Sequence, residues 1–171
     1  MLRKTNTQKV MEMFFDFPTT TFTVREIARR LKISPPGSSS AVKTLEKEGL
    51  LTRKKGEAID QVRANADTRN FVLRKRLYNI ERLQSLGLTE RLQESNPKAV
   101  ILFGSYSRGE DTERSDIDIA VIGKAPVGLE RFEKQLNRTI NIHEIDLRKT
   151  SKELKNSLAN GIVLEGYLEL L

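Results

Sequence analysis

Apolar residues in the first part of the chain recur at the spacing of short amphipathic helices. Residues 7–17 are apolar densely enough for a buried helix, and Pro18 ends it. Thr23 and Glu26 have the spacing of a capping box, in which each side chain accepts a hydrogen bond from the backbone N–H of the other residue. A short second helix is therefore expected after Thr23, with apolar residues Ile27, Ala28 and Leu31.

The pattern then changes from helix to hairpin. Residues 34–37, Ser-Pro-Pro-Gly, predict a turn, and residues 38–48 predict a third helix that Gly49 ends. Strand-forming residues at 50–53 and 58–62 enclose a basic segment. This arrangement predicts a hairpin with a basic tip.

This order of elements resembles the winged helix-turn-helix module of bacterial and archaeal transcription regulators. Residues 22–31 resemble its second helix, and residues 41–51 resemble its recognition helix and first wing strand. The resemblance implies double-stranded DNA as a partner, with the third helix in the major groove and the wing on the backbone or minor groove. The implied DNA-facing residues are Ser38, Ser39, Ser40, Lys43 and Thr44, with Arg53, Lys54, Lys55 and Arg63 on phosphates. The alternative is a winged helix that contacts only proteins.

The charge distribution also indicates a polyanionic partner for this half. Residues 1–82 contain 18 Lys and Arg against 9 Asp and Glu, whereas residues 83–171 contain 12 against 14. The formal net charge of +7 therefore resides in the first half. A basic half joined to a mildly acidic one is typical of a DNA-binding module fused to a second domain.

A longer helix is expected between the halves, over residues 67–86, where apolar residues recur near helical spacing. It resembles the linking helix of many such regulators, which often forms a dimer contact, so a homodimer is one expectation. A helix that simply packs between two domains is the alternative.

The second half opens with a strand, a Gly-Ser turn and a pair of carboxylates. An apolar strand at 100–103 leads into Gly104 and Ser105, a polar loop follows at 106–115, and Asp116 and Asp118 begin another strand. Side chains alternate along a strand, so both carboxylates are expected on one face. Two such carboxylates beside a turn of phosphate size are what a magnesium-dependent phosphoryl or nucleotidyl transfer site requires. The alternative is a turn cap at Asp116 and a solvated strand residue at Asp118.

The remaining elements predict an α+β fold with a small mixed sheet. Glycine, asparagine and proline bracket a short helix before Lys98, and three further elements follow before Gly161. They are a helix at 129–137, a strand at 139–147 and a helix at 151–160, with a final short element at 162–164.

Residues 103–118 resemble the minimal nucleotidyltransferases, the smallest members of the superfamily that includes polymerase beta and kanamycin nucleotidyltransferase. The resemblance extends over residues 98–171. It implies that backbone N–H groups of Gly104 and Ser105 hold a nucleoside triphosphate, with ATP the expected one, and that Asp116 and Asp118 bind magnesium. It also implies phosphate neutralisation by Arg108, for which an ordinary surface position is the alternative.

The chain departs from this family at one important position. A third carboxylate normally lies on a later strand, in a phrase like Arg-x-Val-Asp-Leu, and Asn141 occupies its place here. Asparagine offers an oxygen to a metal but cannot act as a base near neutral pH. Glu144 and Asp146 are expected on the opposite strand face. His143 is expected on the same face as Asn141, as a base, a ligand or a structural residue.

Composition excludes several classes of protein. The chain has no cysteine and one histidine, which excludes disulfides, thiolate metal sites and a multi-histidine zinc site within one chain. No apolar run approaches the ~20 residues that span a bilayer. No apolar signal region follows the N-terminus, so a cytoplasmic protein without membrane contact is expected.

The sequence thus predicts a winged helix at 1–66, linking helices at 67–97 and a minimal nucleotidyltransferase domain at 98–171. The expected function is DNA-linked regulation, with a second domain that binds a nucleoside triphosphate and Mg²⁺ and transfers a nucleotidyl group to a partner, either a protein or a nucleic acid. One alternative is an antitoxin-like adenylyltransferase that modifies a paired toxin and represses its own operon. Another is a non-catalytic regulator with a decayed nucleotidyltransferase domain.

Overall fold

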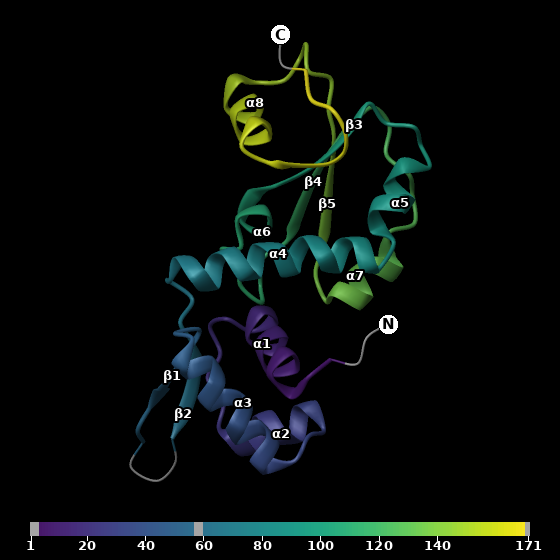
Figure 1. The fold of residues 1–171 in the computed structure, drawn as a ribbon. Coiled ribbons are helices and arrows are strands. Elements are labelled where there is room, and N and C mark those ends of the chain that lie inside the picture. The colour runs from purple at the N-terminus through teal and green to yellow at the C-terminus, as the bar shows by residue number, and fades with distance from the viewer. Residues whose placement is uncertain (1–3, 57–59, 170–171) are drawn as a thin grey trace. The chain divides into compact units, whose positions relative to one another are not determined.

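The structure is a computed structural model that describes residues 4–56 and 60–169 (Figure 1). The chain divides into two compact units, Met1–Lys75 and Arg76–Leu171. Within the described ranges, no helix combines the length and apolar character that crossing a bilayer requires.

The N-terminal unit begins with three helices, α1 (Asn6–Asp16), α2 (Val24–Leu31) and α3 (Pro35–Lys47). The capping box before α2 is confirmed, because the backbone nitrogen of Thr23 donates to Glu26 Oε2 at 2.7 Å and that of Glu26 donates to Thr23 Oγ1 at 3.2 Å. The three helices enclose an apolar core, in which Phe14, Ile27 and Leu45 are buried.

The predicted start of the third helix is wrong by one turn. α3 begins at Pro35, where a turn was expected, because Ser34 caps the helix and accepts a hydrogen bond from the backbone nitrogen of Gly37 at 3.2 Å. Proline is well suited to the first turn of a helix, where its missing N–H costs no intrahelical bond.

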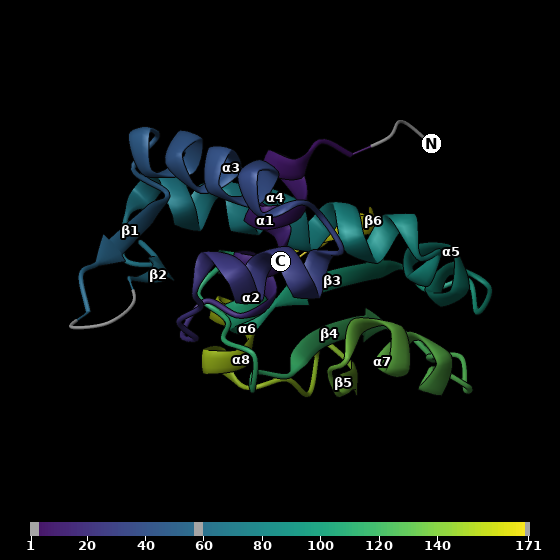
Figure 2. The ribbon, with the colours of Figure 1, turned by 90° about the horizontal axis from the view of Figure 1, so that it is seen from below.

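The predicted wing is present as strands β1 (Leu51–Lys54) and β2 (Gln61–Ala64), which pair antiparallel. The second strand starts later than the predicted 58–62, and residues 57–59 of that prediction lie outside the described residues. Val62 also pairs with Phe22, which ties the wing to the segment before α2. In Figure 2, α3 lies beside the two wing strands.

Two helices follow the wing. The expected helix at 67–86 is present as α4 (Arg69–Ser85), and the short helix before Lys98 as α5 (Leu88–Gln93). α4 passes from the first unit into the second, since the units divide after Lys75.

The C-terminal unit contains the predicted mixed sheet. Its strands are β3 (Ala99–Phe103), β4 (Ile117–Ile122), β5 (Ile140–Glu144) and β6 (Ile162–Gly166), in the order β5-β4-β3-β6. β4 and β5 pair in parallel, and the other neighbours pair antiparallel. The strand predicted at 139–147 ends earlier, at Glu144. A turn follows, in which the backbone nitrogen of Lys149 donates a 3.0 Å hydrogen bond to Asp146 O.

Different helices cover the two faces of this sheet (Figure 1). On one face, Val100 and Leu102 of β3 join a core with residues of α4, α5 and α7 (Glu130–Leu136). On the other face, Ile101 of β3 packs with Leu158 of α8 (Lys152–Ala159). Because Phe103 lies on the same face as Ile101, the end of β3 presents its side chain to the α8 side.

The polar loop expected at 106–115 is partly wrong. Gly104–Arg108 forms a short helix, α6, in which Tyr106 and Ser107 are buried. Only the following segment is irregular, and even there Asp111 is buried. The connection between the Gly-Ser turn and the carboxylates is therefore anchored in the core.

Candidate active site

The two aspartates and Asn141 meet at one point of the sheet. Asp118 in β4 pairs with Asn141 in the parallel strand β5. The side-chain nitrogen of Asn141 lies 3.4 Å from Asp116 Oδ2 and 3.2 Å from Asp118 Oδ1. One carboxamide thus contacts both carboxylates, at the position where the resemblance implies a third acid.

Gly104 lies next to the carboxylate of Asp118. Its φ is +73°, a left-handed conformation that glycine adopts readily. A Cβ atom at this position would lie 2.6 Å from Asp118 Oδ2, closer than real contacts allow. The left-handed backbone therefore favours glycine here, and an added Cβ would displace the carboxylate of Asp118.

The Gly-Ser turn starts α6. Gly104 and Ser105 are its first residues, a position where backbone N–H groups have no acceptor within the helix. Arg108, at the end of α6, is exposed, and its Nε lies 2.7 Å from Glu110 Oε2. The structure thus places Arg108 near the turn but in a surface ion pair.

His143 and Glu144 on β5 make different contacts from Asn141. His143 Nε2 is 3.7 Å from Asp118 Oδ1, and its ring packs edge-on against Phe103 with 5.2 Å between ring centres. Glu144 Oε1 accepts a hydrogen bond from the backbone nitrogen of Ala125 at 2.8 Å. The side chain of Glu144 is therefore engaged away from the aspartates.

Asp146 lies beyond the end of β5. Its Oδ1 accepts a 3.1 Å bond from the backbone nitrogen of Arg148, which lowers the pKa of Asp146 below its usual value. Across the part of the chain that the structure describes, no three acidic or histidine side chains gather as a metal-binding group. Asn141 contacts both aspartates, and His143 lies beside Asp118.

A buried ion pair lies next to the segment that leads into Asp116. Arg138 Nη2 lies 3.4 Å from Asp111 Oδ2, and the side chains are 6% and 0% exposed. Asp111 Oδ1 also accepts a 2.8 Å bond from Asn79 Nδ2 of α4, which donates to Tyr106 O at 2.9 Å as well. This network joins α4, α6 and the segment before β5.

The same arginine holds the segment that ends at the first aspartate. Arg138 Nη1 donates to the backbone oxygens of Thr112 and Ser115, the latter at 3.1 Å. Asp116 follows directly, so Arg138 fixes the backbone from which it projects. Sequence analysis missed this role, although Arg138 begins the same phrase that contains Asn141.

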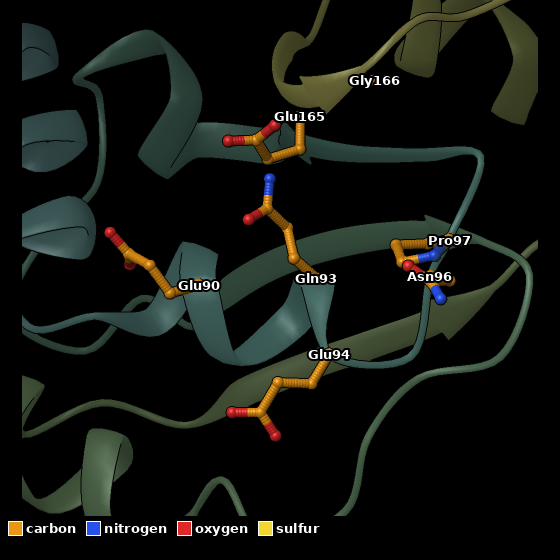
Figure 3. A pocket seen from close by; sticks show the side chains of 7 residues that line it. All are labelled: Glu90, Gln93, Glu94, Asn96, Pro97, Glu165 and Gly166. Carbon is orange, nitrogen blue, oxygen red and sulfur yellow. The ribbon is translucent and has the colours of Figure 1, made fainter.

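A further hollow of this unit lies away from the aspartates. Figure 3 shows Glu90 and Gln93 on α5, Glu94 at its C-cap and Glu165 on β6 around a cavity of about 470 Å³. Of the described residues that line it, none is Lys or Arg. Because its three carboxylates repel anions, this cavity does not suit a triphosphate.

The predicted DNA-facing residues of α3 divide into two groups. Ser38 is fully buried, and its Oγ donates to Val24 O at 3.0 Å, so its prediction as a DNA contact is wrong. The reason was visible in the sequence, since Ser38 precedes the apolar residues Val42 and Leu45 by four and seven positions and shares their helix face. Ser39 is half-buried; the exposed residues are Ser40, Lys43 and Thr44.

The basic residues of the wing also differ from one another. Lys54 and Lys55 are exposed. Arg53 instead donates through Nε and Nη2 to the two carboxylate oxygens of Glu46 on α3, at 3.1 and 3.0 Å, and this raises the pKa of Arg53 further. Arg63 Nε donates to Thr52 Oγ1 at 3.2 Å. Arg53 thus ties the wing to α3, while the two lysines remain accessible.

Each of the two units contains a segment that matches a known protein family. Residues 88–168 match the family described as polymerase beta, nucleotidyltransferase. Residues 16–58 match the MarR family. Two relatives from Methanocaldococcus jannaschii bear the name "putative protein adenylyltransferase". One, MJ0126, is 33% identical over 95 residues, which cover 56% of this chain and 94% of the relative. The other, MJ0604, is 65% identical over 26 residues, 15% of this chain and 26% of the relative.

Two solved structures similar to this chain come from Lactococcus lactis and Methanosarcina mazei. Lactococcus lactis ZitR, in its C30AH42A mutant apo form, has 19% identity and a TM-score of 0.41, with coverage of 50% of this chain and 64% of ZitR. A possible transcriptional regulator from Methanosarcina mazei Go1 has 20% identity and a TM-score of 0.36, and the match covers 52% of this chain and 78% of that protein. This chain therefore spans less than two thirds of that ZitR structure. Through its C-terminal unit the chain belongs to the polymerase beta-type nucleotidyltransferase family, and residues 16–58 of its N-terminal unit match the MarR family.

Proposed function

We propose that this protein is a DNA-binding regulator whose C-terminal unit binds a nucleoside triphosphate, ATP, with Mg²⁺ and transfers the adenylyl group to a partner protein. The observation that carries the proposal is the meeting of Asp116, Asp118 and Asn141 beside the Gly104-Ser105 turn. The name of the adenylyltransferase relatives supports adenylyl as the transferred group.

The residues at this point fit a magnesium ion. Mg²⁺ prefers oxygen ligands, and the two carboxylates supply them. The oxygen and nitrogen of a carboxamide occupy nearly equivalent positions, so Asn141 can present its oxygen to the same point by a half-turn of the group. Asp116, Asp118 and Asn141 would then hold the ion, which neutralises phosphate charge and orients the triphosphate when bound.

The reaction exchanges one phosphorus–oxygen bond for another. An acceptor hydroxyl oxygen bonds to the α-phosphorus while the bond from that phosphorus to the bridging α–β oxygen breaks. The products are the adenylylated acceptor, pyrophosphate and the hydroxyl proton. Gly104 and Ser105 supply backbone N–H groups that bind the phosphate chain, an interaction suited to a turn without bulky side chains.

Asn141 limits how fast this chain performs the reaction. A carboxylate at that position accepts the hydroxyl proton, whereas a carboxamide cannot take it near neutral pH. We therefore expect nucleotide binding with slow transfer. This expectation favours a second candidate function, a regulator that senses a nucleotide without transferring it.

The N-terminal unit supplies the DNA contact in this proposal. Its exposed Ser40, Lys43 and Thr44 on α3 and Lys54 and Lys55 on the wing have the side chains that bind phosphates and groove edges. The excess of basic residues in this half supplies attraction to the phosphate backbone.

Incubation of the full chain with Mg²⁺ and ATP labelled at the α-phosphate tests the proposal. The protein encoded by the neighbouring gene is added to one set of samples, and label on protein is measured. Label on that neighbour, absent from Asp116→Asn and Asp118→Asn chains, supports transfer. Mg²⁺-dependent ATP binding without label on any protein supports the sensor, and the lack of binding overturns both.

A further inference from the structure

The exposed face of α3 carries few side chains that distinguish one base pair from another. Ser40, Lys43, Thr44 and Lys47 are exposed and follow one another at helical spacing, and we call these residues the α3 stripe. In the major groove, base pairs are told apart chiefly by Arg, Lys, Asn and Gln side chains. α3 contains no Arg, Asn or Gln, so lysine is the only one of these residue types in the stripe.

The two hydroxyl residues of the stripe supply little sequence preference. Thr44 Oγ1 donates to Ser40 O at 3.1 Å, so its single proton is not available to DNA. The hydroxyl of Ser40 can both donate and accept, and it can therefore bond to either kind of base edge. Both side chains are also short, which suits them to a nearby phosphate rather than to a chosen base.

Two other side chains of this surface bind each other. Glu46 on α3 is of a type that accepts from cytosine, and Arg53 on the wing is of a type that donates to guanine. Both carboxylate oxygens of Glu46 accept from Arg53, through Nε at 3.1 Å and Nη2 at 3.0 Å, and we call this pair the clamp. The third guanidinium nitrogen, Nη1, lies 3.8 Å from Asp60 Oδ2. Charge-assisted bidentate bonds are strong, so the clamp holds both side chains to the protein.

Lys43 is therefore left as the base-reading candidate of α3. It is the first charged residue of the helix, whereas Lys47 is the last residue. Recognition helices contact base edges through residues toward their N-terminus, which favours Lys43 over Lys47. Lys43 forms no ion pair with any residue that the structure describes. Its flexible four-carbon stem gives the ammonium group a reach that the serines lack.

A cation in the major groove is attracted to the N7 and O6 acceptors of guanine, a pair that no other base presents. We propose that Lys43 sets the sequence preference of DNA binding, for guanine, and that the other residues of the α3 stripe contact phosphates. The inference rests on the proposed function, since it names the base that the proposed DNA-binding unit prefers.

Fluorescence anisotropy of the full chain with labelled duplexes tests this assignment. One duplex contains guanine, the second has 7-deazaguanine in its place, and the third has inosine. The 7-deaza base lacks the N7 acceptor of the major groove, whereas inosine keeps N7 and O6 and lacks only the amino group of the minor groove. The native chain should bind the guanine and inosine duplexes alike and the 7-deazaguanine duplex about ten-fold more weakly, the effect of one base contact.

Two lysine variants assign the contact to a residue. Lys43→Ala should bind the three duplexes alike, and alanine favours the helix, so α3 should remain folded. Lys47→Ala removes the same charge one turn further along the stripe and is the matched control. It should weaken binding to all three duplexes by the same factor, as expected for a phosphate contact. Loss of the guanine preference in Lys47→Ala, or its persistence in Lys43→Ala, would overturn the assignment to Lys43.

The double variant Glu46→Ala, Arg53→Ala removes the clamp without a change in net charge. The guanine preference should persist in this variant, because the clamp keeps both side chains from the bases. A lost preference would give the base contact to Arg53 instead. Equal affinity of the native chain for the guanine and 7-deazaguanine duplexes would overturn this inference and leave DNA binding intact. The lack of binding to any duplex at low salt would overturn the DNA contact of the proposed function as well.

Discussion

Asn141 Nδ2 lies 3.2 Å from Asp118 Oδ1, directly across the parallel register of β5 and β4. The resemblance to the nucleotidyltransferases implies a third carboxylate at this position, and here a neutral amide donates toward the pair. The site therefore has the position of the third acid but neither its negative charge nor its basicity. In the proposed function, this difference decides between adenylyl transfer and nucleotide binding alone.

Asn141→Asp is expected to raise adenylyl transfer. The added carboxylate supplies charge for metal binding and accepts the hydroxyl proton, and general-base catalysis contributes about 10²–10⁴ in rate. An increase of at least about ten-fold in label transferred per minute is a fair threshold. Asn137→Asp, the same change at an exposed residue after α7, should have no effect. Rapid transfer by the native chain would contradict the premise and direct attention to Glu144 or Asp146.

Asp116→Asn and Asp118→Asn should each abolish Mg²⁺-dependent ATP binding. Both substitutions keep the side-chain size and remove one negative charge from the metal-binding set, so the fold should persist. Calorimetry with and without a chelator measures the binding, and circular dichroism checks the fold. Equal affinity for ATP in chelator and in Mg²⁺ would show that these carboxylates do not act through a metal ion.

Gly104→Ala should destabilise the chain and remove nucleotide binding. The left-handed backbone costs alanine about 1 kcal/mol, and the new Cβ collides with Asp118 Oδ2. Gly49→Ala is a matched control, because Gly49 has φ +72° but a Cβ there would meet no atom within 4 Å. Urea unfolding should show a loss of stability in both variants, and only Gly104→Ala should lose ATP binding. Intact ATP binding in Gly104→Ala would mean that this turn does not shape the site.

The sequence predicted the helices, strands and caps better than the contacts between residues far apart in the chain. The alternation at Asp116 and Asp118 and the capping box at Thr23 depend on residues close in the chain, and such spacing is visible in a sequence. The pairing of Asp111 with Arg138 joins residues far apart in the chain, and no local pattern indicates it. For the same reason the segment before Asp116 was expected to be a polar loop.

A hollow of about 390 Å³ beside α8 shows the same limit. Asn156 and Ser157 fit the polar side of a short helix in the sequence. They lie beside Gly104 only because α8 packs on β3, where Leu158 and Ile101 share an apolar cluster.

Asp111→Ala should be strongly destabilising. It leaves the guanidinium of Arg138 buried without its carboxylate, a change that typically costs about 3–5 kcal/mol. Glu110→Ala breaks the exposed pair with Arg108 and should cost at most about 1 kcal/mol. Urea unfolding of the two variants measures the difference. Similar stability losses would show that the buried pair does not support the segment before Asp116.

The last prediction concerns the wing. The double variant Lys54→Ala, Lys55→Ala should weaken DNA binding at all sequences alike, because lysine contacts to phosphate carry no base information. The slope of log affinity against log salt should flatten by about 0.9 for each phosphate that the variant no longer binds.

Lys149→Ala with Lys152→Ala removes the same charge from the C-terminal unit and serves as the control. Fluorescence anisotropy with a labelled duplex, measured across a salt series, gives both the affinity and the slope. If the wing lysines bind phosphates, only the first double variant changes the slope, since charge on the other unit makes no phosphate contact. Equal changes in both variants would instead indicate a general effect of net charge, and a slope unchanged in both would remove the wing from the DNA interface.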